Sequence, residues 1–196
     1  MKYLLEHEER ALLKALRDSK AATRDLTVVE LVLHTGLRVQ ELRLLNVGDV
    51  LNGMIIRDHL VVRAETAKRC KAREVFLNSH ISKILKTFIA YKRALGESME
   101  PIAPLFVSKK GGRIGQRTLQ DLSEKWFVKA GLVDAKGRSR YHFHSLRHSF
   151  SMKLRRRGVS LERIQRLLGH ASLQATSIYV VPSREDLIEA LQVLAA

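Results

Sequence analysis

The chain has 196 residues, of which 45% are hydrophobic, and 35 Lys and Arg against 20 Asp and Glu give a net charge of +15. This length supports one domain with a buried core, and the charge favours a polyanionic partner, either nucleic acid or an acidic membrane surface. A single cysteine, Cys70, excludes an internal disulfide framework, and no apolar run approaches the roughly 20 residues of a membrane span.

The N-terminal half shows helical periodicity. Residues 24–35 are apolar almost all round after Leu26, which predicts a central helix. Apolar residues at i, i+3, i+4, i+7 and i+8 predict a second helix over about 79–94, and the same spacing predicts a third over about 116–130.

Three short segments read as strands instead. They are rich in Val and Ile, they are separated by polar turns, and they comprise Met54–Arg57, His59–Ala64 and Glu74–Leu77. Such runs predict a small three-stranded antiparallel sheet, with a lysine-rich turn between its last two strands.

The C-terminal third is helical again. We expect helices at Phe143–Arg157, Leu161–Leu168 and Ser172–Val180, with glycines at the ends of the first two, and a last amphipathic helix from about 183 to 194. The fold class is therefore α+β, mostly helical, with one small sheet. The acidic N-terminus does not read as a signal peptide, so we expect a cytoplasmic protein.

Two candidate sites for an anion involve arginine. His144 and Arg147 are three residues apart, so a helix places both on one face, where they could grip one anion. Arg38 follows the Gly36 turn at the mouth of a helix, and Glu41 lies one turn further, where it could orient the guanidinium. Each pair could equally be an ordinary surface pair.

Three further residues have side chains that could take part in catalysis, but their neighbours in the sequence do not show that they do. His170 and Tyr179 would lie on opposite faces of one unbroken helix, but Gly169 allows a new helix to begin near residue 172 at another angle. Tyr179 could otherwise be a packed core residue. Lys68 in a strand turn could be solvated, or could protonate a leaving alkoxide.

The order of these residues is more informative than any one of them. The segments TGLRVQEL (35–42), KRCKAREV (68–75), HSLR (144–147) and LGHASLQATSIY (168–179) resemble the tyrosine recombinase family, also called lambda-integrase-like or phage integrase. The resemblance covers nearly the whole chain, and the last segment is its most specific part.

The resemblance implies a mechanism. Tyr179 would attack a scissile DNA phosphate and form a 3′-phosphotyrosyl bond, which a 5′-hydroxyl later resolves. The roles implied for the other residues are a phosphate clamp of Arg38 and Arg147, Lys68 as the acid with Lys71 as its competitor, His144 in proton transfer, His170 as a hydrogen-bond donor and Glu41 as an orienter. Because bond energy is kept in the phosphotyrosine, no metal or nucleotide cofactor is expected.

The resemblance also implies partners. Double-stranded DNA is the expected ligand, with a tetramer on DNA, and the expected DNA-binding residues are Arg69, Lys71, Lys109, Lys110, Arg113, Arg117, Arg138 and Arg140. Residues 1–196 are expected to form the catalytic domain without the family's N-terminal DNA-clamping domain. Residues 183–196 could be exchanged between protomers or could pack back on their own domain.

Three other readings stay open. A helix-turn-helix over residues 160–179 could belong to a DNA-binding regulator without catalysis. The same chemistry also occurs in type IB topoisomerases, which relax supercoils. A membrane-surface protein would share only the positive charge.

Overall fold

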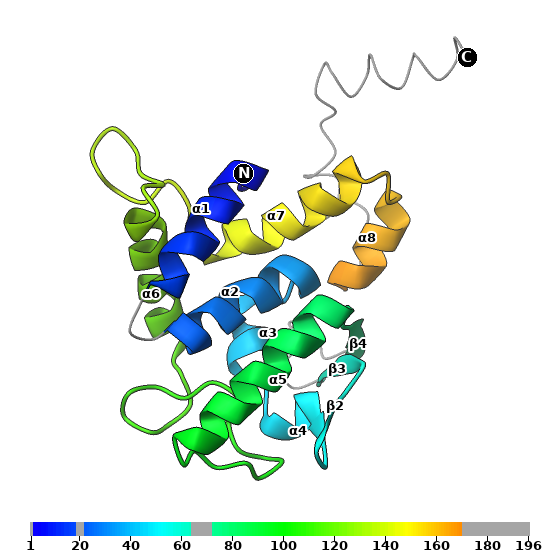
Figure 1. The fold of residues 1–196 in the computed structure, drawn as a ribbon. Coiled ribbons are helices and arrows are strands. Elements are labelled where there is room, and N and C mark those ends of the chain that lie inside the picture. The colour runs from blue at the N-terminus through cyan, green and yellow to red at the C-terminus, as the bar shows by residue number, and fades with distance from the viewer. Residues whose placement is uncertain (1, 19–21, 64–71, 170–196) are drawn as a thin grey trace.

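The computed structural model describes residues 2–18, 22–63 and 72–169 (Figure 1). Within these ranges the chain forms eight helices and four short strands. In chain order they are α1 (Glu6–Arg17), α2 (Ala22–Thr35), α3 (Val39–Arg43), α4 (Val47–Val50), β1 (Leu51–Asn52), β2 (Ile55–Ile56), β3 (His59–Val62), β4 (Arg73–Phe76), α5 (Ser79–Ala94), α6 (Gln116–Lys129), α7 (Phe143–Arg156) and α8 (Leu161–Leu168).

Helix α2 is the centre of the fold, and it contacts α1, α5 and α7 (Figure 1). A helix that is apolar on every side has to be covered on every side. Its residues Leu31, Val32 and Leu33 are accordingly buried. The prediction of a central helix at 24–35 is confirmed.

The predicted helices at 79–94 and 116–130 are also confirmed, as α5 and α6. Each buries the stripe that predicted it, with Ile81 and Phe88 buried in α5 and Leu119 in α6. Helix α5 begins where the Asn78 side chain accepts a hydrogen bond from the backbone N–H of Ile81 at 3.0 Å, which caps its first turn.

The prediction of one three-stranded sheet is wrong. In the described residues β1 pairs with β2, and β3 pairs separately with β4, so two two-stranded antiparallel sheets form. The cause is a tight turn at Gly53–Met54, where Gly53 adopts a φ of 59°. This turn folds Ile55–Ile56 back on Leu51–Asn52, and β2 then pairs with the preceding segment instead of with β3.

Helices α7 and α8 confirm two of the C-terminal predictions. The expected helices at 172–180 and 183–194 lie outside the described residues. No helix in the described part of the chain is long and apolar enough to cross a membrane.

Candidate active site

A glycine turn brings Arg38 against the C-terminal helices. Helix α2 ends at Thr35, and Gly36 follows with a φ of 65°. A Cβ at Gly36 would lie 2.6 Å from the Phe150 ring of α7 and 2.8 Å from Leu168 of α8. The close approach therefore requires glycine, and it places Arg38, the first residue before α3, beside α7.

Glu41 is the hub of the site. Its buried carboxylate accepts a hydrogen bond from Arg38 Nη1 at 2.7 Å and another from the Arg38 backbone N–H at 2.9 Å. Arg73 of β4 binds both carboxylate oxygens at 2.8 Å, and Arg147 Nη1 lies 3.9 Å from Oε2. One carboxylate thus holds three guanidinium groups from three separate segments.

These arginines keep Glu41 ionised. Burial by itself raises the pKa of Glu41, but the hydrogen bonds and charge of Arg73 and the backbone bond and charge of Arg38 outweigh it and lower the pKa to about 2. The carboxylate therefore stays charged throughout the neutral range, and it holds the arginines in place at every pH at which the protein is expected to work.

Arg147 is 1% exposed and fastens α7 to two other segments. Its Nη2 donates to the carbonyl oxygen of Leu168 at the end of α8 at 2.9 Å, and its Nη1 donates to the carbonyl oxygen of Gly36. The Arg147 guanidinium, for which the family resemblance implies a role in binding phosphate, therefore also holds the turn before Arg38.

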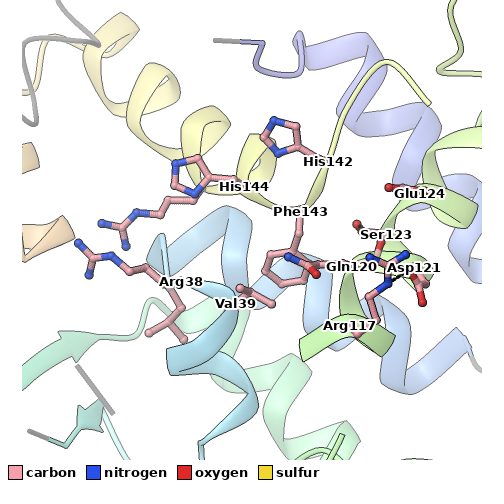
Figure 2. Close-up of a pocket in the computed structure, with 12 residues that line it drawn as sticks. Arg38, Val39, Arg117, Gln120, Asp121, Ser123, Glu124, His142, Phe143 and His144 are labelled. Atoms are coloured by element: carbon pink, nitrogen blue, oxygen red, sulfur yellow. Dashed lines mark hydrogen bonds and ion pairs between the residues drawn. The ribbon is translucent and has the colours of Figure 1, made fainter. Parts of the chain in front are cut away.

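A cavity of about 310 Å³ opens beside this network. Its lining comes from the start of α3 and the two residues before it, from α6 and from the start of α7. It comprises Leu37, Arg38, Val39, Arg117, Gln120, Asp121, Ser123, Glu124, His142, Phe143, His144 and Arg147. Figure 2 shows Arg38 and His144 at one end of the cavity, with Arg117 and Asp121 of α6 at the other.

The environment of His144 favours its neutral form. Partial desolvation lowers the pKa of His144, and its electrostatic interactions with Arg147, His142 and Arg38 lower it further. A neutral imidazole has a free lone pair, so at neutral pH this side chain can accept a proton. The structure thus brings together Arg38, Glu41, His144 and Arg147 among the predicted site residues.

The other predicted catalytic residues, Lys68, His170 and Tyr179, lie outside the described residues, as do Arg69 and Lys71. Residues close to them in sequence are in the network, however. Arg73 follows the lysine segment, and Gly169 precedes His170. A Cβ at Gly169 would lie 2.7 Å from Arg73 Cδ, so the Arg73 side chain packs directly on this glycine.

Arg73 is the residue that sequence reasoning missed. It lies within the segment 68–75 that carries part of the family resemblance. Nothing local shows that its guanidinium binds Glu41, which is 32 positions away. Only the folding of β4 against α3 reveals the pair.

The expected DNA-binding residues lie in different settings. Lys109 and Lys110 are exposed in the turn before Gly111, and the Arg117 side chain is 87% exposed at the cavity. Arg138 and Arg140 pair with Asp134 and Glu8 respectively. Arg113 donates to the carbonyl oxygens of Arg43 and Leu45 and to Asn46 Oδ1, so its guanidinium holds the fold together.

The charge of Glu41 predicts how stability depends on pH. The pKa of Glu41 is about 2 in the folded protein against an ordinary value of 4.5. Its contribution to the free energy of unfolding is therefore complete above pH 4.5 and is lost as the pH falls toward 2. We expect the melting temperature of the wild type to fall more between about pH 5 and pH 3 than that of Glu41→Gln. Equal slopes in thermal unfolding would contradict this assignment.

Comparison with known proteins shows the family to which this chain is similar. A family model described as the phage integrase family matches residues 2–185. Tyrosine recombinase XerC of Haemophilus ducreyi is 33% identical over 165 residues, which cover 83% of this chain and 49% of the relative. XerC of Bacillus subtilis is 31% identical over 190 residues, covering 95% of this chain and 59% of the relative. The chain therefore spans about half to three fifths of these relatives.

Solved structures show the same fold. The crystal structure of XerA recombinase superposes with a TM-score of 0.79 at 28% identity, over 100% of this chain and 66% of that one. XerH site-specific recombinase, in a post-cleavage complex with a palindromic difH substrate, superposes with a TM-score of 0.77 at 26% identity, over 99% of this chain and 53% of that one.

Proposed function

Because this chain belongs to the phage integrase family of tyrosine recombinases, we propose that it is a site-specific recombinase that cuts and rejoins DNA through a covalent bond to Tyr179. The observation that carries this proposal is the shared end of one cavity, where Arg38 and His144 lie together and Arg147 forms part of the wall. Arg38 precedes His144 and Arg147 by 106 and 109 positions, so only the tertiary fold brings the three residues to one cavity.

The two arginines would bind the scissile phosphate. Charge builds up on the non-bridging oxygens as the phosphorus becomes five-coordinate, and fixed guanidinium donors stabilise that charge. Glu41 accepts a hydrogen bond from Nη1 of the Arg38 guanidinium, and the Arg38 side chain remains 25% exposed. Its guanidinium is thus held from behind by Glu41 and is still accessible to a ligand in the cavity.

The reaction balances without a cofactor. The phenol oxygen of Tyr179 bonds to phosphorus while the bond from phosphorus to the 5′-oxygen breaks, and Lys68 protonates that oxygen. His144, in its neutral form, accepts the phenol proton, and His170 donates a hydrogen bond to the phosphate. In the second step a 5′-hydroxyl attacks the phosphotyrosine, so the bond energy of the phosphodiester is retained.

The proposed partners are double-stranded DNA and further copies of this chain, in a tetramer on DNA. The exposed side chains of Lys109, Lys110 and Arg117 support DNA binding, and Arg117 also lines the cavity. Residues 1–196 would form the catalytic domain, residues 183–196 would exchange between protomers, and the protein would act in the cytoplasm. XerH site-specific recombinase, a structural neighbour of this chain, is bound to its difH substrate in the solved complex, which supports DNA as the partner.

Covalent capture tests the proposal. Duplexes with a nick next to a randomised core release a short leaving strand, so a cleaving recombinase stays attached to them. We expect a protein–DNA adduct that survives denaturing gels and disappears after protease digestion, and sequencing of the captured cores would identify the target. Retarded bands in native gels without any adduct would favour a binding module over an enzyme.

Arg73 is expected to position the catalytic arginine. In Arg73→Ala the buried Glu41 loses both hydrogen bonds from the Arg73 guanidinium, which should lower the free energy of unfolding by about 3 kcal/mol. Well below the melting temperature, adduct formation should still be slower by about tenfold or more while DNA affinity stays close to wild type. Arg73→Lys keeps the charge without the fork and should recover part of the rate. Wild-type rates in folded Arg73→Ala would assign Arg73 to stability alone.

A further inference from the structure

Three side chains that the proposed reaction does not use meet between α2 and α5. Glu30 and His34 are four residues apart on α2 and so share a face, and His80 lies in the first turn of α5. His80 Nε2 is 3.2 Å from Glu30 Oε2, and His34 Nε2 is 3.6 Å from the same oxygen. One ligand atom from each residue lies within 4.8 Å of the other two.

The carboxylate of this cluster is buried, and no lysine or arginine in the described part of the chain forms an ion pair with it. Glu30 is 3% exposed, and in the described residues its ion-pair contacts are the two imidazoles. A buried carboxylate is costly unless a positive charge compensates it.

We propose that Glu30, His34 and His80 bind a divalent transition-metal ion, with Zn²⁺ as the best fit. Two imidazole nitrogens and one carboxylate oxygen are a typical zinc ligand set, and a fourth position remains for water. Ligands about 2.0–2.2 Å from a tetrahedral zinc lie roughly 3.3–3.5 Å apart. The separations of 3.2 and 3.6 Å are already near that spacing.

The bound ion would be a structural link. It would join the C-terminal part of α2 to the start of α5, two helices that already pack against each other. His80 is half exposed, with 53% of its side chain accessible, so an ion can enter from solvent. This inference does not depend on the proposed DNA reaction, and its test needs no DNA.

Asn78 sets the affinity of the site. Its Oδ1 accepts from the Ile81 N–H, so its Nδ2 donates to His34 Nδ1, 3.0 Å away, and the proton of His34 is on Nε2. Metal binding needs a lone pair on Nε2 and moves that proton to Nδ1, where it would face the amide donor. An aspartate at position 78 could cap α5 and also accept from Nδ1–H, as second carboxylates do at zinc histidines.

The experiment is a Zn²⁺ titration of the full chain in chelator-free buffer, read by competition with a chromophoric chelator and by thermal unfolding. Wild type should bind one equivalent that His80→Ala loses, and Zn²⁺ should raise the melting temperature of wild type only. His7→Ala removes an exposed histidine of α1 and should bind as wild type does. This comparison separates the cluster from the other histidines and from Cys70.

Asn78→Asp gives the sharper result, because it should bind Zn²⁺ about tenfold more tightly than wild type. Mg²⁺ should neither bind nor shift the melting temperature, since it prefers oxygen ligands. Equal zinc affinity in wild type and His80→Ala, with no shift in melting temperature, would overturn the proposal. Weaker binding in Asn78→Asp would overturn the assigned role of Asn78.

Discussion

Phenylalanine at position 179 is expected to abolish covalent capture of DNA completely while leaving DNA binding unchanged. The proposed bond to phosphorus is made by the phenol oxygen, and Tyr179→Phe removes that atom and nothing else. No neighbouring water can replace it in this assay, because hydrolysis would leave no protein attached to the strand. Denaturing gels with the nicked duplex measure the adduct, and native gels measure binding.

The matched control is Tyr91→Phe. Tyr91 is a half-buried tyrosine of α5 that stacks on Phe88 and is not part of the cavity lining. Removal of the Tyr91 hydroxyl should leave covalent capture of DNA at the wild-type level. An adduct that persisted in Tyr179→Phe would show that another residue is the nucleophile and would remove the central assignment.

Alanine at position 38 is expected to slow adduct formation by about 10²- to 10³-fold, which corresponds to about 3–4 kcal/mol of transition-state stabilisation. Arg38 lines the cavity with its guanidinium held by Glu41 Oε1, so its removal deletes a fixed donor at the phosphate. The fold should persist, because Glu41 keeps its two bonds to Arg73. Single-turnover rates on the nicked duplex measure the effect.

Arg117→Ala is the control within the same cavity. Arg117 lies at the other end, pairs with Asp121 at 2.9 Å and is mostly exposed, so its loss should weaken DNA binding more than it slows cleavage (Figure 2). Cleavage by Arg38→Ala at the wild-type rate would show that Arg38 does not contact the reacting phosphate.

Arg147→Ala should also lose about 3 kcal/mol or more of transition-state stabilisation. The substitution additionally releases the carbonyl oxygens of Gly36 and Leu168, so its effect combines a loss of catalysis with a loss of folding stability.

The network around Glu41 explains how distant segments could act together. One ionised carboxylate joins α3, β4 and α7, and the Arg73 stem packs on Gly169, the residue before His170. A shift of β4 would therefore move Glu41, and a shift of Glu41 would move Arg38. We expect disturbances of any one segment to reach the phosphate-binding end of the cavity.

Most of the helical framework was predictable from sequence. An apolar stripe at helical spacing is a local signal, and it placed α2, α5 and α6 within one or two residues of their observed limits. The pairing of strands was not predictable, because a short run rich in Val and Ile indicates a strand but does not indicate the strand with which it pairs. The Gly53 turn decided that pairing by joining β1 to β2.

Part of the candidate site was predictable for a different reason. The segments around Arg38, His144 and Arg147 carry a family pattern, so their order alone indicated a shared site. The pairing of Arg73 with Glu41 and of His80 with Glu30 could not be found from that pattern, since the two residues of each pair lie 32 and 50 positions apart.

The amino-acid order alone predicted helices α2, α5, α6, α7 and α8, the positive charge and the family whose chemistry uses these arginines, histidines and the tyrosine. Each of these depends on neighbours in sequence or on a linear pattern. The three-dimensional fold alone decided which carboxylate holds which arginine, and that two histidines face a buried glutamate. Ion pairs and ligand clusters form across the packed core, where distance in space bears no relation to distance along the chain.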